Sequence, residues 1–518
     1  MIYILLALAL CKTLYWLYVW QLKEYRLDRM RDFLSTHTGR HKVWRNVFSV
    51  ADIVLLIVSL LLASSLSPLL SILWGIVCGA EVLMYILARS SFKPRFTAKA
   101  LLVIALTFFI TFFIAQMSRV SAFMLFVFTP LLVPFIVTAI ILLFNPLSRI
   151  ARGVVISIAK QRLEQMKEKP IVVGITGSFG KTTTKEYLKT ILSEKFRVMI
   201  TPAHVNVDIG VARAILKLLK DDTQVCIVEM GAYRQGEIAA ICRMVKPHIG
   251  IITAIADQHL SLFGDVKIIQ QTKGELIQAL PEDGLCVVNQ DFILATEAAK
   301  LWSKAPVYTY STNRPANITV SEVEAKRNAV QARYRGKRLN FSFTAPMHGK
   351  HLLSNVLAAI TVAEHLGLSQ EEIVRGLEKI DTLEGTMQLV TGKTGATVID
   401  DHYNSNPEGF TAALEYLNTF NGQRKIVVTP GMLELGTASA ERHHDVGKAI
   451  ADNADVCIIT KKDFAQDIIT GIETSARRIE FHVCSSSEEA VGLIEGTSEK
   501  DCILLEGRST TPIINALI

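Results

Sequence analysis

A glycine-rich run at residues 174–186, GITGSFGKTTTKE, holds the residue types that phosphate chemistry needs. It follows an apolar segment and precedes a helix-forming one, so we expect a strand, a tight turn and a helix. Glycines let backbone N–H groups surround an anion, a lysine reaches the terminal phosphates, and a threonine hydroxyl suits a nucleotide-bound Mg²⁺. The spacing departs from G-x-x-x-x-G-K-T, because Ile175 occupies the place of the first glycine. The run predicts an ATP-binding loop of Gly177, Ser178, Gly180, Lys181, Thr182 and Thr183.

Three other residues that suit this chemistry lie at or near the ends of apolar segments. Glu229 ends VCIVEM, His259 follows IGIITAIADQ, and Lys273 lies in the helix-like run KIIQQTKGELIQAL. Open α/β sheets build their sites at the carboxyl ends of strands, where an acidic residue is the expected Mg²⁺ partner of a phosphate loop. Taken singly, each has an ordinary alternative: a capping carboxylate, a surface imidazole or a solvated lysine.

The elements that must position these residues alternate along the chain. From residue 169, apolar strands and helical stretches follow one another, which predicts an α/β fold with a largely parallel sheet. Residues 305–346 instead indicate short antiparallel strands. We expect a central ATP-binding domain at 169–382 and a Rossmann-like domain at 383–518. The second domain has five strand-like runs, at 396–400, 425–429, 456–460, 479–484 and 502–506.

Residues 1–145 differ sharply in composition from the rest. Five apolar runs there are each near the roughly 20 residues that cross a bilayer; they lie at 1–20, 47–66, 69–88, 100–117 and 122–144. Basic loops alternate with nearly neutral ones, and the positive-inside rule then predicts a transmembrane domain of about five helices, with the N-terminus outside. The first run lacks the basic start and cleavage site of a signal peptide, so we expect it to remain as a span.

Two features of this part leave alternatives open. Glu81 falls inside the third apolar run, where a carboxylate is either a functional or pairing site or reaches interfacial water from a helix end. Residues 146–168 form a basic connector that lies either against the anionic inner leaflet or in solvent as a linker helix. Its apolar residues are Ile150, Val154, Ile158, Leu163 and Met166.

Charge and cysteine usage exclude some classes of protein. The net charge of +7 comes largely from the basic loops of the N-terminal part, and basic patches interleaved with aromatic residues are missing, so we expect no nucleic-acid partner. The eight cysteines are scattered singly without zinc spacing, which is typical of a reducing compartment.

Seven motifs occur in order along the second part of the chain: GITGSFGKTTTKE, TPAHVNVDIG (201–210), VEMGAYRQGEIA (228–239), ADQHLSLFG (256–264), QTKGEL (271–276), HGKHLLSNVLAA (348–359) and IDDHYNSNPEG (399–409). In these motifs the chain resembles the Mur ligases, which use ATP to add amino acids to bacterial cell-wall precursors. The last motif, together with the sequences MGA (230–232) and KGE (273–275), is most similar to the motifs of the branch that adds D-alanyl-D-alanine to the muramoyl tripeptide. The resemblance covers roughly residues 169–518.

The resemblance implies roles for individual residues. Lys181 would bind the β- and γ-phosphates, and Thr182 with Glu229 would hold the first of two Mg²⁺ ions. His259 matches the ligand of the second ion, and Lys273 matches the lysine that CO₂ carbamylates in many members. The motifs that line the nucleotide supply Asn289, His351, Asn355 and Asp401, and the start of the last domain supplies the substrate-binding Asp400, Tyr403, Asn404 and Asn406. An ordinary Asn-rich turn and helix cap is the alternative for that last segment.

The implied chemistry is an ATP-dependent, ADP-forming acid–amino-acid ligation. An acceptor carboxylate would attack the γ-phosphate to form an acyl phosphate, and an amine would then displace phosphate to give an amide. The amine would be an amino acid or D-alanyl-D-alanine. Since apolar runs stand where Mur ligases have a UDP-sugar-binding domain, we expect a membrane-associated wall precursor, or one delivered by a membrane complex, with a cytosolic UDP-muramoyl tripeptide as runner-up.

Departures from the family pattern keep other functions open. Many members have a Gly-Arg pair near the start of the last domain, where this chain has Gly385 and Thr386. A membrane-linked poly-γ-glutamate synthase is one alternative, and a nucleotide-binding membrane scaffold without catalysis is another. The expected location is the bacterial inner membrane, with the catalytic domains in the cytoplasm.

Overall fold

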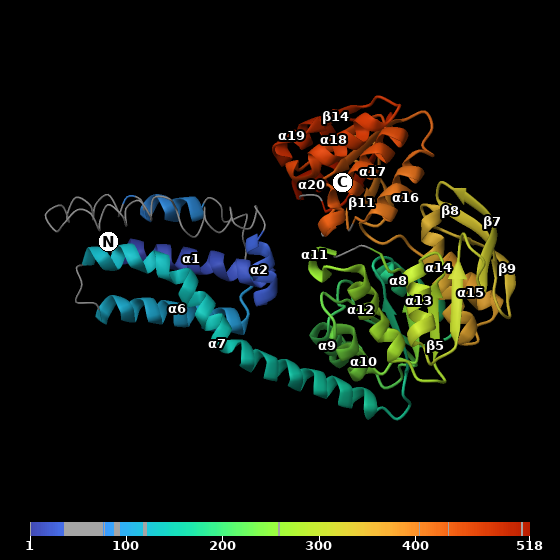
Figure 1. The fold of residues 1–518 in the computed structure, drawn as a ribbon, viewed down its shortest axis with the longest axis horizontal. Helices are drawn as coiled ribbons and strands as arrows, with labels where there is room; N and C mark the ends of the chain where they lie inside the picture. The colour runs from blue at the N-terminus through green and yellow to red at the C-terminus, as the bar shows by residue number, and fades with distance from the viewer. Residues whose placement is uncertain are drawn as a thin grey trace. The chain divides into compact units, whose positions relative to one another are not determined.

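The computed structural model describes residues 2–35, 76, 78–86, 94–117, 122–256, 260–403, 405–433, 435–508 and 511–518. The chain forms two compact units, Met1–Gly153 and Val154–Ile518 (Figure 1).

The described residues of the N-terminal unit form helices joined by short turns. Its helices are α1 (Ile2–Leu22), α2 (Leu27–Ser35), a helix at 78–86, α6 (Ala98–Met117) and the first part of α7 (Ala122–Glu164). The expected runs at 1–20, 100–117 and 122–144 fall on α1, α6 and α7, whereas the run at 47–66 and most of that at 69–88 lie outside the described residues. Because α7 continues through residue 145, the expected connector is not a separate helix.

Length and apolar composition single out one helix in the described part that could cross a membrane, Leu132–Glu164. Two shorter apolar helices accompany it, Leu6–Leu22 and Ala98–Phe113. Glu81, whose role was open, forms an ion pair with Lys12, with 3.6 Å between Nζ and Oε2. Both side chains are almost fully buried, so Glu81 is a pairing residue in this unit.

The second unit begins with a nine-stranded sheet in the order β2-β3-β1-β4-β5-β6-β7-β8-β9. In this order, each strand from β2 to β7 pairs in parallel with its neighbour, whereas β7 with β8 and β8 with β9 pair antiparallel. The expected antiparallel segment at 305–346 is therefore confirmed except for its first strand, β6. The bounds are β1 (Ile171–Thr176), β2 (Val198–Ile200), β3 (Val225–Glu229), β4 (Ile249–Ile252), β5 (Leu285–Asn289), β6 (Val307–Ser311), β7 (Ile318–Lys326), β8 (Ala329–Arg335) and β9 (Asn340–Ala345).

Helices cover both faces of this sheet because the central strands are buried on both sides, as parallel strands require. One apolar cluster joins the sheet to α8 (Lys181–Leu192), α14 (Leu353–His365) and α15 (Gln370–Glu378). The other joins it to α9, α10, α12 and α13. Their bounds are α9 (Asp208–Leu218), α10 (Glu237–Val245), α12 (Val266–Gln278) and α13 (Ile293–Trp302), with the short α11 (Leu260–Phe263) before α12.

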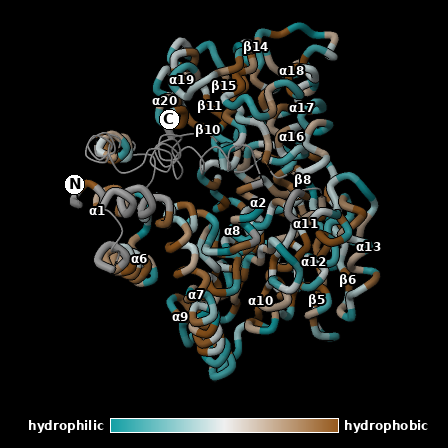
Figure 2. Tube along the Cα trace, turned by 60° about the vertical axis from the view of Figure 1, so that its left-hand side comes forward, coloured by the Kyte–Doolittle hydropathy of each residue, from teal (hydrophilic) through white to brown (hydrophobic). Residues whose placement is uncertain are grey.

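The end of α7 belongs to this second cluster. Ala159, Leu163 and Met166 are buried there, whereas Ile150, Val154 and Ile158 are exposed. Figure 2 shows both hydrophobic and hydrophilic residues along α7. Neither alternative for the connector, contact with the inner leaflet or solvation, describes Leu163 and Met166, because these two side chains pack into the domain that follows.

The last domain has a six-stranded sheet in the order β10-β11-β15-β12-β13-β14, parallel except for β10. All five expected strand runs are confirmed, and β10 is an addition. Helices α16, α17 and α18 pack on one face and α19 and α20 on the other. The bounds are β10 (Gln388–Thr391), β11 (Thr397–Asp401), β12 (Arg424–Thr429), β13 (Val456–Ile459), β14 (Glu480–Val483), β15 (Asp501–Glu506), α16 (Pro407–Leu417), α17 (Ser439–Asn453), α18 (Ala465–Thr474), α19 (Ser487–Glu495) and α20 (Thr511–Leu517).

Candidate functional site

The glycine-rich turn lies between β1 and α8, as the sequence predicts. Gly177 must be a glycine, because a Cβ there would lie 1.9 Å from the Thr253 hydroxyl oxygen. Gly180 has a φ of +77°, and a Cβ there would lie 2.5 Å from Asn355 Oδ1. The turn is thus fitted closely against the loop after β4 and against α14, with its N–H groups at the N-terminus of α8.

Ser178 and Thr253 connect the turn to the loop after β4. The Ser178 backbone N–H donates to the Ala254 carbonyl (2.8 Å), and the Ser178 hydroxyl donates to the Ala256 carbonyl (3.1 Å). The Thr253 hydroxyl donates to the Phe179 carbonyl. The Ser178 side chain therefore holds the shape of the phosphate loop.

Glu229 lies at the carboxyl end of β3, next to the start of α8, and is 1% exposed. Its Oε2 accepts a hydrogen bond from the Thr182 hydroxyl (3.0 Å) and lies 3.4 Å from Lys185 Nζ. Its Oε1 accepts from the Asn206 amide (3.1 Å). A buried carboxylate beside a threonine hydroxyl is an oxygen donor set that fits Mg²⁺. Among the described residues, no group of three or more His, Cys, Asp or Glu side chains is arranged so that it could hold a metal ion.

Lys181 lies near this carboxylate, and Lys273 lies near Lys181. Lys181 Nζ donates to the carbonyls of Gly177 (2.7 Å) and Ser178 (3.1 Å), and burial lowers its pKa, partly opposed by the charge of Glu229. Lys273, on α12, is 6% exposed. Burial lowers the pKa of Lys273 well below its ordinary value, and the neighbouring positive charge of Lys181 lowers it further.

A second group of predicted residues lies on β5, on α14 and in the turn before α14. The Asn289 amide donates to the Ser354 hydroxyl (2.9 Å), and the Thr184 hydroxyl donates to Asn355 Oδ1 (3.1 Å). Burial lowers the pKa of His351 to about 4, so this imidazole is neutral at physiological pH. Neutral donors and acceptors of this kind suit a nucleoside.

The last domain contributes residues from the segment after β11. Tyr403 stacks on His204 of the central domain, with 4.7 Å between the ring centroids, and its hydroxyl forms a hydrogen bond with His204 Nδ1. Asn406 caps α16 by accepting from the Gly409 N–H (2.9 Å). Asp400 forms a hydrogen bond with His402 Nδ1 (2.5 Å).

These elements enclose a cavity of about 670 Å³ between the two domains of the second unit. It is lined by most of the predicted residues: Ser178, Gly180, Lys181, Thr182, Thr183, Glu229, Asn289, His351, Asn355, Asp401, Tyr403 and Asn406. The lining does not include Gly177, Lys273 or Asp400. His259 and Asn404 lie outside the described residues.

Four polar or charged residues stand out among those of this site that sequence reasoning missed. His204, Asn206 and Arg508 line the cavity, and Lys185 lies buried beneath Glu229. A signal for each was present: the first two fall in a motif after β2, Arg508 follows the last strand, and Lys185 lies one helical turn after Lys181. Their contacts depend on which strands are neighbours, which the motifs do not state.

Comparisons with known proteins assign the two domains separately. Residues 175–363 match the Mur ligase middle domain, and residues 385–509 match the Mur ligase glutamate ligase domain. Among relatives, the UDP-N-acetylmuramoyl-tripeptide–D-alanyl-D-alanine ligase of Bacillus subtilis is 29% identical over 57% of this chain and 63% of its own. The Escherichia coli enzyme of that name is 29% identical over 54% and 61%. The chain thus spans less than two thirds of the length of these relatives.

Solved structures agree on the fold. The crystal structure of MurF from Acinetobacter baumannii has a TM-score of 0.62 at 28% identity, over 70% of this chain and 78% of that one. MurF ligase from Thermotoga maritima in complex with ADP has a TM-score of 0.61 at 24% identity, over 70% and 83%.

Proposed function

Because the chain belongs to the Mur ligase family, we propose that it is an ATP-dependent amide ligase that forms ADP. It would activate an acceptor carboxylate as an acyl phosphate and join it to an amine. The observation that carries this proposal is the single cavity that holds the phosphate loop, the Thr182–Glu229 pair and the first turn of the last domain. The phosphate loop, Thr182 and Glu229 line the cavity from the central domain, and Asp401, Tyr403 and Arg508 line it from the last domain.

The residues divide the work of phosphoryl transfer. The N–H groups of the turn and Lys181 would hold the β- and γ-phosphates, since both lie at the start of α8. Thr182 and Glu229 would hold Mg²⁺, and the bound ion would offset charge on the transferring group. Lys185 and Asn206 fix the Glu229 carboxylate in that position. Closure of the two domains over the bound substrates would exclude water from the acyl phosphate, which water would otherwise hydrolyse.

We include carbamylation of Lys273 by CO₂ in the proposal, because the surroundings of its amine favour this reaction. An uncharged amine is the form that reacts with CO₂, and burial beside Lys181 favours that form. Conversion to a carbamate places an anion beside the cation of Lys181. The product would serve as a ligand of a second Mg²⁺ together with His259.

For the substrates, we infer a peptidoglycan-type acceptor and an amino acid or D-alanyl-D-alanine as the amine. The names of the relatives support this choice, because they use D-alanyl-D-alanine and a muramoyl tripeptide. Tyr403 and Arg508 on the last domain line the cavity where an amine with a carboxylate would enter. Thr386 stands where many Mur ligases have an arginine, and Arg508 supplies a guanidinium to the same cavity.

We further propose that the N-terminal unit holds the enzyme at the bacterial inner membrane, with the two ligase domains in the cytoplasm. The apolar helices α1, α6 and α7 and the alternation of basic and neutral loops support this topology. A membrane-associated acceptor would then reach the cavity without a UDP-binding domain. A cysteine placed at position 67 should label from outside intact cells, and one at position 35 should not.

The substrate proposal is tested by measuring ADP release from full-length protein in detergent. UDP-linked and lipid-linked muramoyl peptides would be offered in turn, each with D-alanyl-D-alanine, D-alanine or glutamate. Preference for a lipid-linked acceptor supports a membrane substrate, whereas equal use of the UDP-linked tripeptide contradicts it. Chain growth with glutamate alone would favour the poly-γ-glutamate alternative.

A further inference from the structure

A second cavity, of about 700 Å³, lies in the central domain at the opposite edge of the sheet from the phosphate loop. Val172, near the start of β1, and His248, just before β4, line it. Its other walls are the end of α7, helix α10 with the loop after it, and the end of α12. It shares no lining residue with the ligase cavity. Small-molecule sites have volumes of roughly 300–1,000 Å³, so this cavity is large enough for a ligand of its own.

Part of the lining is apolar. Leu163, Val172 and Val245 contribute buried aliphatic side chains. Cys242 is also buried, and burial raises the pKa of its thiol to about 12, so the thiol is uncharged there. These side chains offer an apolar surface to a hydrocarbon group.

The two carboxylates that line the cavity are already engaged by other groups of the protein. Glu164 Oε1 accepts from Lys246 Nζ (2.8 Å). Glu275 accepts from two backbone N–H groups at the start of α10, those of Gly236 (2.6 Å) and Ala239 (2.8 Å). Neither carboxylate therefore serves as the counter-charge of a further cation in the lining.

Two cations in the lining have no such partner. Arg243 and Lys169 are exposed, and no carboxylate among the described residues forms an ion pair with either. Guanidinium and ammonium groups form charge-assisted hydrogen bonds with phosphate oxygens. The cavity thus joins an apolar wall to two positive charges that are available to an anion.

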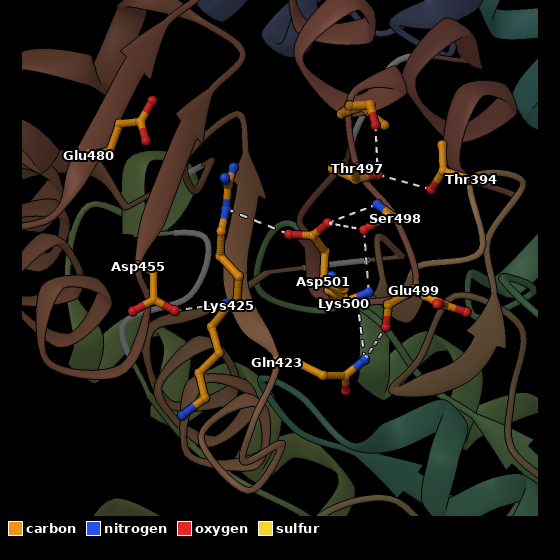
Figure 3. A network of polar contacts seen from close by, with 12 residues as sticks. Thr394, Gln423, Lys425, Asp455, Glu480, Thr497, Ser498, Glu499, Lys500 and Asp501 are labelled. Atoms are coloured by element: carbon orange, nitrogen blue, oxygen red, sulfur yellow. Dashed lines mark hydrogen bonds and ion pairs between the residues drawn. The ribbon is translucent and has the colours of Figure 1, made fainter.

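The same edge of the other sheet shows charges that are paired within the chain. Arg424 begins β12 and Asp501 begins β15, with 3.5 Å between Arg424 Nε and Asp501 Oδ1. Asp501 Oδ2 also accepts from the Ser498 N–H (2.8 Å) and the Ser498 hydroxyl (3.2 Å) (Figure 3). The arginine there has a carboxylate partner, whereas Arg243 has none in the described part of the chain.

We propose that the second cavity binds a phosphate ester that carries an apolar group. The phosphate lies against Arg243 and Lys169. The apolar group packs on Leu163, Cys242 and Val245. This site goes beyond the proposed ligase function and does not depend on it, because none of its residues lines the ligase cavity.

This chemistry has two sources, an anionic phospholipid and a soluble phosphate ester. The lipid is the nearer source if the proposed membrane location holds, because the cavity lies where α7 ends. The segment Leu132–Glu164 of that helix is long and apolar enough to cross a membrane, and Glu164 itself lines the cavity.

The test follows amide hydrogen exchange at residues 239–248 of full-length protein in nanodiscs. Hexyl phosphate is titrated into phosphatidylcholine nanodiscs, and phosphatidylglycerol is added to the lipid mixture in a separate arm. We expect hexyl phosphate to slow exchange in this segment and to do so at lower concentration than inorganic phosphate. Arg243→Gln should weaken this effect about tenfold or more, since it removes a charged hydrogen-bond donor. Arg213→Gln is the matched control, because Arg213 is exposed on α9 and lines neither cavity.

Protection by phosphatidylglycerol without hexyl phosphate would identify the lipid as the source, and protection by hexyl phosphate alone would identify a soluble ester. Protection by neither, or an equal effect of Arg243→Gln and Arg213→Gln, would overturn the inference. ADP release without either probe should be the same in Arg243→Gln as in the unaltered enzyme. Failure of the unaltered enzyme to release ADP would count against the proposed function and leave this site standing.

Discussion

Lys185→Met tests whether the metal-binding carboxylate depends on a buried counter-charge. Lys185 is fully buried, with Nζ 3.4 Å from Glu229 Oε2 and 3.3 Å from Glu186 Oε1. Methionine keeps the length of the side chain but removes the charge, leaving Glu229 buried without a cation at that oxygen. Breaking a buried ion pair from one side destabilises a protein by about 3–5 kcal/mol.

Urea denaturation of the full-length protein, followed by brief proteolysis of the unfolded fraction, measures this loss. With a urea dependence of about 2–3 kcal/mol per molar, the midpoint of the central domain should fall by about 1–2.5 M. Lys189→Met is the matched control, because Lys189 lies on the same helix and is exposed; its free energy of unfolding should change by less than about 0.5 kcal/mol.

A double variant separates charge from packing. Lys185→Met with Glu229→Gln removes both charges, so its midpoint should lie above that of Lys185→Met alone, although it cannot bind the metal. If Lys185→Met unfolds at the same urea concentration as Lys189→Met, the electrostatic role of Lys185 is refuted.

Three further predictions concern residues in and around the cavity. Gly177→Ala should weaken ATP binding about 5- to 150-fold, equivalent to about 1–3 kcal/mol, because the added Cβ would clash with the Thr253 hydroxyl and displace the backbone. A nucleotide titration measures the affinity, with Gly492→Ala as the control because a Cβ there has no neighbour within 4 Å. Unchanged affinity in Gly177→Ala would contradict the close fit of the turn. Lys273→Ala should abolish turnover and regain part of it with acetate, which supplies the missing anion; full turnover without acetate argues against a carbamate. His351, with a pKa of about 4 in the folded protein and about 6.5 unfolded, contributes stability that is complete above pH 6.5 and is lost as the pH falls towards 4. Urea midpoints of His351→Asn across that range should vary less than those of the unaltered protein, and parallel curves would refute the assignment.

The sequence was sufficient for the elements that repeat a local pattern. The phosphate loop, the strand before it and Glu229 could be predicted, because glycine spacing and apolar runs depend on neighbours in the chain. The five strand runs of the last domain follow for the same reason. β6 was assigned to the antiparallel group because its short apolar run carries no sign of its partner; in the structure it pairs in parallel with β5.

The features that could not be predicted depend on pairing between distant segments. Asp401 lies opposite Glu506 only because β11 and β15 are neighbours in register. The contact between His204 and Tyr403 requires two domains to meet. Leu163 and Met166 fit the apolar face of a connector helix equally well, and only the folded domain shows that they are buried in it.

The most direct test of the central claim is ADP release by full-length protein with ATP, Mg²⁺, a muramoyl-peptide acceptor and D-alanyl-D-alanine. The proposed mechanism predicts sustained release only when acceptor and amine are both present. It also predicts a loss of about 100-fold or more in Lys181→Ala, with the protein still folded. Release that is independent of the acceptor and the amine, or turnover of Lys181→Ala within about threefold of the unaltered enzyme, would contradict the assignment of this cavity as a ligase active site.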